Sequence, residues 1–147
     1  MTPVNVYIEI DNKAPKRQLR AYGYVLECEI GGELKTRSSC AMVDDTYHAV
    51  MLKALEASLA RIRKPCEITV YGPDAWVLGM LTQQVKKWAK DNFRNGSGEP
   101  IAHQKQWIHI WCLMEHMGIT TKAGPHAYSK WLKDEMRKSI SIQKSSE

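Results

Sequence analysis

The sequence predicts an α/β fold in which a five-stranded mixed sheet, antiparallel in its first three strands, is flanked by helices. Three observations support it: an alternating strand at the N-terminus, a glycine hairpin after it, and an ordered succession of strand-like and helix-like segments. The chain has 147 residues, 44% of them hydrophobic and 25% charged, which suits one domain with a single core. We expect that domain to span residues 1–138 and a flexible tail to span residues 139–147.

The first expected strand, residues 4–11, is the centre of the predicted sheet. Apolar and polar residues alternate along VNVYIEID, so successive side chains point to opposite faces, and Glu9 points away from the valine and isoleucine face. The same alternation predicts a second strand over residues 19–30. The Gly31-Gly32 pair is a strong hairpin signal, and it leads into a third strand over residues 34–41.

A long helix is expected after the third strand, with Asp44 and Asp45 as its N-cap residues. Apolar residues recur at helical spacing up to Ile62, and basic residues followed by Pro65 end the helix. The β-branched stretch 66–71 predicts the fourth strand. The later segments are expected in this order: a helix containing Trp76, a basic segment at 83–94, a loop at 95–100, a helix with Trp107, Ile110, Trp111 and Met114 on its buried face, a strand at 119–122 and a helix at 126–138.

Composition narrows the classes of function. The formal net charge is +5 and the pI is about 9.0, which favours polyanionic partners. The four cysteines are widely spaced and form no CxxC pair, so neither a zinc motif nor a disulfide framework is indicated. No apolar stretch resembles a signal peptide or a membrane span, so we expect a cytoplasmic protein without a membrane partner.

Two segments, together with the order of elements, resemble the type 1 ribonuclease H family. Residues 86–107, KKWAKDNFRNGSGEPIAHQKQW, are similar to the family's basic protrusion. They contain a lysine- and tryptophan-rich helix, a Gly-Trp-Lys-like element at Asn92-Phe93-Arg94, a glycine-containing loop, and a helix that begins before a tryptophan. The second segment is ALEASL, residues 54–59, ahead of the fourth strand. The resemblance spans nearly the whole chain and implies a ribonuclease H-like fold.

The resemblance implies cleavage of the RNA strand of RNA/DNA hybrids by two divalent ions, held in the family by a cluster of carboxylates. The acid of the first strand corresponds to Glu9. The glutamate of the first helix corresponds to Tyr47, the aspartate after the fourth strand to Pro73, and the aspartate of the last helix to a position near Leu132. The family's phosphate-holding Thr-Asn pair is also lost, because Met42-Val43-Asp44-Asp45 stands at its position. The resemblance therefore implies a degraded active site.

Nearby residues could still complete an active site. Asp74 follows Pro73 directly, so we predict Glu9 and Asp74 as the metal ligands and, with His126, as the catalytic residues of an active enzyme. His126 stands where the family carries a histidine before the last helix, although a histidine at a helix start is more often a capping or surface residue. The cofactor would be Mg²⁺ or Mn²⁺ if the protein is active, and otherwise none.

The basic segment is the functional feature that is kept best. Four basic residues and one acid within residues 86–94 contribute +3 of the formal +5. Lysines bind phosphates by counterion release, and aromatic faces can contact sugars or bases. In the family this element grips the DNA strand of the hybrid. The positions that we carry over as nucleic-acid-binding are Lys86, Lys87, Trp88, Lys90, Asn92, Phe93 and Arg94. An alternative reading of Trp88 is that it packs on the core.

Three hypotheses follow from the sequence. The first, which we favour, is a monomeric ribonuclease H-like protein that binds RNA/DNA hybrid or duplex RNA with impaired catalysis. The second is an active, divergent metal-dependent ribonuclease H. The third is a protein-interaction module on the same scaffold, because a fold does not fix a function. Salt-sensitive binding of nucleic acid separates the first two from the third, and metal-dependent cleavage separates the second from the first.

Overall fold

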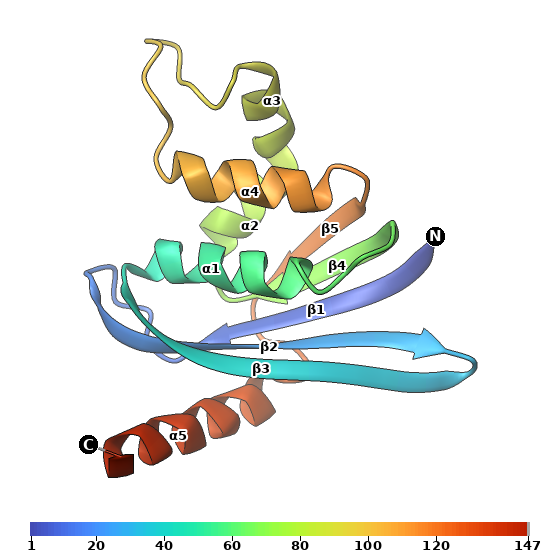
Figure 1. The fold of residues 1–147 in the computed structure, drawn as a ribbon, viewed down its shortest axis with the longest axis vertical. Coiled ribbons are helices and arrows are strands. Elements are labelled where there is room, and N and C mark those ends of the chain that lie inside the picture. The colour runs from blue at the N-terminus through green and yellow to red at the C-terminus, as the bar shows by residue number, and fades with distance from the viewer. Residues whose placement is uncertain (147) are drawn as a thin grey trace.

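The computed structural model describes residues 1–146, and these residues form ten helices and strands (Figure 1). Each strand and helix expected from the sequence has a counterpart. In chain order they are β1 (Thr2–Ile10), β2 (Gln18–Ile30), β3 (Glu33–Asp45), α1 (Tyr47–Leu59), β4 (Cys66–Gly72), α2 (Ala75–Gln83), α3 (Val85–Lys90), α4 (Gln104–Met114), β5 (Gly118–Ala123) and α5 (Ser129–Ser146).

The strands form one mixed sheet in the order β3-β2-β1-β4-β5. β1 pairs antiparallel with β2, with Ile8 opposite Tyr24, and β2 pairs antiparallel with β3. β1 and β4 run parallel, with Tyr7 opposite Tyr71, and β4 pairs in parallel with β5. The predicted fold class is confirmed. Because β1 and β4 are parallel neighbours, their C-terminal ends lie side by side. The edge of the sheet that these strand ends form is distinct from its two edge strands, β3 and β5.

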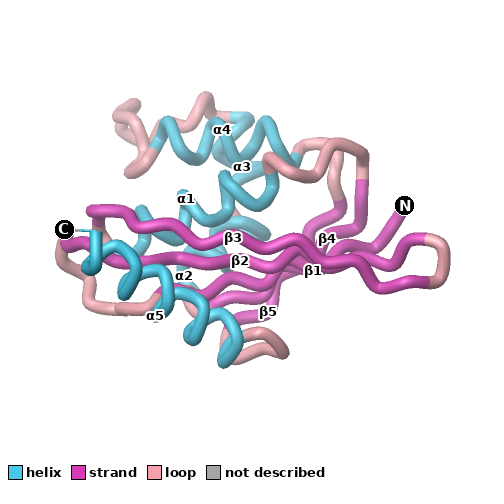
Figure 2. The backbone as a smooth tube through the Cα atoms, turned by 60° about the horizontal axis from the view of Figure 1, so that its bottom comes forward, coloured by secondary structure: helices cyan, strands magenta, loops and turns pink. Residues whose placement is uncertain are grey.

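Helices cover both faces of this sheet. Of the described helices, α5 lies on one face and the others lie on the opposite face (Figure 2). The larger core cluster joins Ile8 of β1 to Leu55 of α1 and Trp107 of α4. A smaller cluster under α5 contains Tyr7 and Leu132. The alternation along β1 therefore divides neighbouring side chains between two cores, and both faces of this central strand are buried.

The start of α1 differs from the expectation. β3 continues to Asp45, which pairs with Gln18 of β2, so Asp44 and Asp45 belong to a strand. The N-cap residue is Thr46, whose side chain accepts a hydrogen bond from the backbone N–H of Ala49 at 3.4 Å. The prediction that the two aspartates cap this helix was wrong, because the pairing of β2 with β3 extends beyond the apolar pattern of the third strand.

Replacing Thr46 with alanine is expected to lower the free energy of unfolding by about 1 kcal/mol, because the first turn of α1 loses its side-chain acceptor. Urea denaturation followed by circular dichroism would measure the difference. The control is Asp44→Ala, which removes an exposed carboxylate 3.7 Å from an exposed arginine and should change stability by less than about 0.5 kcal/mol. A larger loss for the aspartate variant would contradict this assignment of the cap.

The C-terminal helix is longer than expected. α5 begins at Ser129 and extends to Ser146, whereas the sequence suggests an end at Lys138. Glu147 lies outside the described residues, and the division into one domain and a flexible tail stays a prediction. Among residues 1–146, no helix combines the length and apolar character that crossing a membrane requires.

Candidate functional site

Two buried acids lie where β1 and β4 end. Glu9 is the penultimate residue of β1, and Asp74 follows β4. Each is only 3% exposed, although carboxylates are among the side chains least often buried. Burial of an ionised carboxylate is costly unless hydrogen bonds or opposite charges compensate for it. The partners of these two acids therefore indicate what this edge of the sheet can do.

Glu9 is held by the start of α5 and the loop before it. Its Oε2 accepts a hydrogen bond from Ser129 Oγ at 2.5 Å and lies 3.3 Å from Nε2 of His126. Ser129 is the first residue of α5, so the partial positive charge at this helix end also favours the carboxylate. The structure thus brings the predicted residues Glu9 and His126 into contact, and ties the end of β1 to α5.

The His126 side chain is 1% exposed and has fixed partners. Its Nδ1 accepts a hydrogen bond from the backbone N–H of Tyr128 at 3.2 Å, which assigns the ring proton to Nε2. Nε2 in turn donates to the carbonyl of Ile8 at 2.8 Å. The ring is therefore a buried support for the end of β1 and the start of α5, which corrects the surface position considered from the sequence.

Asp74 pairs with a different histidine, supplied by α1. Its Oδ2 lies 2.6 Å from Nδ1 of His48, and its Oδ1 accepts the backbone N–H of Val77 at 3.1 Å as the N-cap of α2. His48 also packs against the ring of Trp76, 4.5 Å away between ring centres. The sequence Gly-Pro-Asp before a helix is a capping signal that could have been used. The partnership of His48 with Asp74 carries no local sequence signal.

Tyr47 takes the position expected for the family's helix glutamate. Its hydroxyl is buried, and no hydrogen-bond partner for it exists among the described atoms. Burial, followed by the negative charges of Asp74 and then Glu9, raises the pKa of Tyr47 to about 12. The hydroxyl is therefore protonated at neutral pH, so Tyr47 adds no negative charge beside Glu9 and Asp74.

α5 presents a serine and a lysine to Glu9. Leu132, near the position expected for the family's last aspartate, is fully buried with Tyr7 on the α5 face of the sheet. Lys133 instead lines, together with Glu9, a cavity of about 60 Å³. The α5 residues beside the acid of β1 are thus Ser129 and Lys133, and the correspondence of the family's last aspartate with a position near Leu132 stays a prediction.

The residues at this edge do not fit a pair of divalent ions. Two close dications need several converging carboxylates. Three of the four carboxylate oxygens of Glu9 and Asp74 are already engaged by protein groups. Among the described residues, no three His, Cys, Asp or Glu side chains gather in a group that could hold a metal ion. The predicted metal ligands therefore lack the supporting ligands that a two-metal site requires.

A buried arginine orders the loop beside this edge. Arg20 is 0% exposed, and its Nη1 donates to the carbonyls of Asn12 and Ala14 at 2.6 and 2.8 Å. Its other nitrogens donate to the carbonyls of Lys16 and Asp45. A buried cation is stable only when its donors are satisfied, and here four backbone carbonyls accept from it. Arg20 therefore ties the loop after β1 to the end of β3.

The basic segment forms α3 and the turn after it, at the upper end of the molecule in Figure 1. The three lysines of α3 are exposed. Trp88, between them, is half-buried, and its ring packs edge-on against Trp107 with 5.3 Å between ring centres. The alternative reading of Trp88 as a residue that packs on the core agrees with this contact.

The turn after α3 has a left-handed backbone at Asn92 and Phe93, with φ of 56° at each. The N–H of Phe93 donates to the carbonyl of Trp88 at 2.8 Å, which closes the turn. The Phe93 ring is 7% exposed and belongs to the core, so it cannot stack on a base, which corrects the sequence-based expectation. Asn92 and Arg94 are exposed, and Arg94 donates to the carbonyl of Gly98 at 2.9 Å.

Comparison with curated proteins finds relatives named ribonuclease H. No family model matches the chain. A ribonuclease H of Clostridium botulinum (strain Hall) is 31% identical over 88 residues, 59% of this chain and 57% of the relative. A ribonuclease H of Actinobacillus succinogenes is 30% identical over 63 residues, 43% of this chain and 41% of the relative. The chain thus spans about half the length of the curated relatives that it matches.

Solved structures match over more of the chain. LC9-RNase H1, a type 1 RNase H with the type 2 active-site motif, gives a TM-score of 0.74 at 14% identity, covering 97% of this chain and 74% of that one. The PFV RNase H domain gives 0.69 at 14% identity, covering 90% of each chain. The foamy viral protease-reverse transcriptase in complex with RNA/DNA hybrid gives 0.62 at 15% identity, covering 92% and 19%. The sheet order, these structural neighbours and the curated relatives agree that this chain has the fold of the ribonuclease H family.

Proposed function

We propose that this chain binds nucleic acid, as RNA/DNA hybrid or duplex RNA, on a ribonuclease H fold whose catalytic function is impaired. The observation that carries the proposal is the basic surface of α3. Its lysines are exposed, and none of them forms an ion pair with an acid in the part of the chain that the structure describes. Unpaired ammonium groups on a rigid helix are available to neutralise backbone phosphates.

The support beneath α3 favours a binding surface rather than a mobile tail. Trp88 anchors the helix against Trp107 of α4, and the turn after it is closed by backbone hydrogen bonds. The lysines therefore project from a positioned element. The type of partner is suggested by the relatives, which are named ribonuclease H, and by the viral enzyme that was solved with an RNA/DNA hybrid.

The contacts of the two buried acids support the second part of the proposal. Glu9 ties β1 to the first turn of α5, and Asp74 caps α2 while it orients His48. These are structural tasks that use the carboxylate oxygens within the protein. Tyr47 and Lys133 occupy the neighbouring positions with a neutral and a positive group. We infer that this edge contacts nucleic acid without the metal-assisted hydrolysis that the family performs.

An active enzyme is the second candidate function, and one observation favours it. Glu9 and Asp74 are both buried at the ends of adjacent parallel strands, and both of their charges act on Tyr47. Metal-dependent activity would require these acids to release Ser129 and His48 and to recruit further ligands. A protein-interaction module, the third possibility, would need none of these features and would not bind nucleic acid with a salt-dependent affinity.

The deciding experiment incubates a labelled RNA/DNA hybrid with the pure protein and with Glu9→Gln, in Mg²⁺, in Mn²⁺ and in EDTA. We expect salt-sensitive binding of the hybrid that EDTA leaves unchanged, and no cleavage by either protein in either metal. Cleavage that is lost in Glu9→Gln would support the active enzyme instead. Absence of binding by the wild type at low salt would remove nucleic acid from the proposal and favour the interaction module.

A further inference from the structure

The cavity beside Glu9 has a positively charged rim. It lies where the loop after β1, the turn after β4 and the start of α5 come together, and its volume is about 60 Å³. The residues that line it are Glu9, Lys13, Pro73, Gly124, Pro125 and Lys133. Two lysines and one glutamate thus line the same cavity, and the remaining lining residues carry no charged side chain. The edge of the sheet that binds cations in the family here presents cations of its own.

The carboxylate of Glu9 has polar partners within the protein. Ser129 donates a hydrogen bond to its Oε2, and His126 Nε2 lies 3.3 Å from the same oxygen. Lys13 and Lys133, by contrast, are exposed, and neither forms an ion pair with any acid within residues 1–146. The formal charges of the two lysines and of Glu9 sum to +1, and this net positive charge in the lining is available to an anion from outside.

The backbone around Lys13 is held in place. The carbonyls of its two neighbours, Asn12 and Ala14, both accept hydrogen bonds from the buried guanidinium of Arg20, at 2.6 and 2.8 Å. Lys133 lies on α5, close to the turn that Ser129 fixes to Glu9. Both lysines therefore extend from positioned backbone, which lowers the entropy lost when an anion binds between them.

A second cavity along α5 is lined by two basic residues and one acid. Its volume is about 280 Å³, and its lining residues are Asp11, Lys133, Arg137 and Ile140, so Lys133 belongs to both cavities. Arg137 pairs with Asp134 at 3.2 Å, but both side chains are largely exposed, so this ion pair is weak. A strand of nucleic acid that reaches Glu9 could therefore continue past a second basic residue on the same helix.

We infer that Lys13 and Lys133 form a phosphate subsite that binds a backbone phosphodiester at the edge of the sheet where the family places metal ions. The inference rests on the proposed function and deepens it, because it names a second contact with nucleic acid, separate from α3. Ammonium groups supply the positive charge that divalent ions would otherwise supply, so this contact needs no metal. They hold the phosphate without offering the ligand positions that activate water.

The test uses the full chain and a fluorescein-labelled RNA/DNA hybrid, with binding followed by fluorescence anisotropy over a series of salt concentrations in EDTA. The variant is Lys13→Gln with Lys133→Gln. We expect its affinity at 50 mM salt to fall by about ten- to a hundredfold, and the slope of log K against log salt to decrease by about 2. Replacing both lysines with arginine should restore most of the affinity, because the positive charges return.

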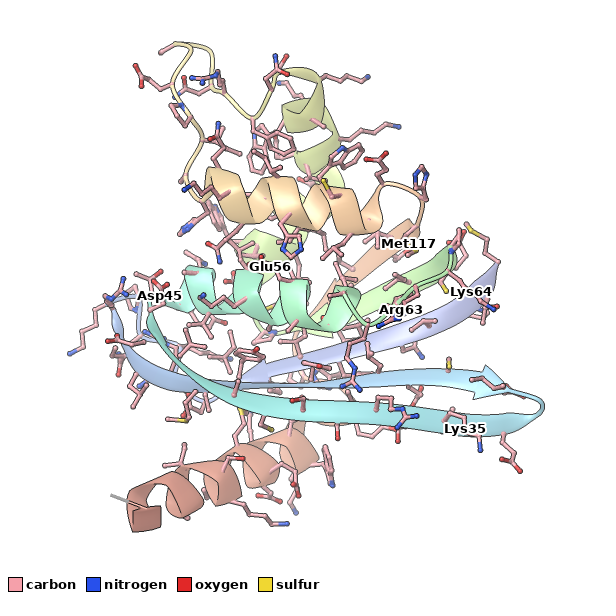
Figure 3. All side chains as sticks on the ribbon, in the orientation of Figure 1. Lys35, Asp45, Glu56, Arg63, Lys64 and Met117 are labelled. Atoms are coloured by element: carbon pink, nitrogen blue, oxygen red, sulfur yellow. The ribbon has the colours of Figure 1, made fainter. Side chains whose placement is uncertain are left out.

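A matched control removes the same charge elsewhere. Lys35, near the tip of the β2–β3 hairpin, and Lys64, before β4, lie near the N-terminal end of β1, as Figure 3 shows, whereas Glu9 lies at its other end. Lys35→Gln with Lys64→Gln should reduce affinity less than threefold and leave the slope nearly unchanged. Equal effects of the two double variants would overturn the subsite. All proteins should show the same thermal unfolding midpoint, since the four side chains are exposed.

A second arm separates the subsite from the proposed function. Inorganic phosphate is added to the ¹⁵N-labelled wild type and to Lys13→Gln/Lys133→Gln, and the amide signals of position 13, Gly124 and Ser129 are followed in both proteins. Saturable shifts in the wild type that the variant lacks would support an anion site here, even if the wild type failed to bind the hybrid. Identical responses of the two proteins, or none in either, together with failure to bind the hybrid, would overturn both proposals.

Discussion

Replacing Lys86 and Lys87 together with glutamate is expected to weaken binding of an RNA/DNA hybrid by about a hundredfold or more at 100 mM salt. Both lysines are exposed on α3, and neither is paired with a described acid. The change removes two phosphate contacts and adds two charges that repel the backbone. Anisotropy titrations at several salt concentrations should therefore give both a weaker affinity and a slope smaller by about 2.

The control for this prediction reverses the same number of charges at Lys35 and Lys64, which lie near the N-terminal end of β1. A general effect of net charge would weaken binding equally in both double variants. A specific contact at α3 predicts a much larger loss for Lys86→Glu/Lys87→Glu. Unchanged binding by the α3 variant would remove this helix from the proposed interface, and the phosphate subsite at Lys13 and Lys133 would then be the remaining candidate contact.

Replacing Arg20 with methionine is expected to lower the free energy of unfolding by about 3 kcal/mol. Methionine can fill much of the same buried space but cannot donate hydrogen bonds. The carbonyls of Asn12, Ala14, Lys16 and Asp45 would lose their charged partner, and the loop after β1 would lose its connection to the end of β3. Urea denaturation of the variant and the wild type would measure the loss.

Arg17→Met is the matched control, because it makes the same chemical change at an exposed arginine a few residues earlier. Arg17 lies 3.7 and 3.6 Å from the carboxylates of Asp44 and Asp45, and two thirds of its side chain is exposed. An ion pair of this kind contributes less than about 1 kcal/mol. Equal losses for the two variants would contradict the role given to Arg20. A loosened loop should also weaken hybrid binding, since it carries Lys13.

The strands and helices could largely be predicted from periodicity. The alternation in β1, the glycine pair before β3 and the apolar spacing in α4 each reflect local geometry that a sequence displays directly. The end of a strand cannot be predicted from periodicity where pairing with another strand decides it. β3 continues through Asp44 and Asp45 because β2 begins early enough to pair with them, and neither residue is apolar.

The candidate site was predicted in part. Glu9, Asp74 and His126 do lie at the edge where the ends of β1 and β4 meet. The loss of the family's other acids stays a prediction from the resemblance. The sequence did not predict the side chains that form hydrogen bonds with Asp74 and Glu9. His48 and Ser129 are separated from their carboxylate partners by 26 and 120 positions, and no local pattern reports a contact over such distances.

The sequence by itself determined the order of elements and the position of the basic segment, and its resemblance to the family predicts the loss of part of the family's carboxylate set. Only the tertiary structure decided which side chains of that segment face solvent, since Phe93 turns into the core through a left-handed turn while the lysines of α3 stay exposed. It also decided that Lys13 and Lys133 share a cavity with Glu9. The physical reason is that burial and charge pairing depend on which elements pack together, whereas periodicity depends on neighbours along the chain.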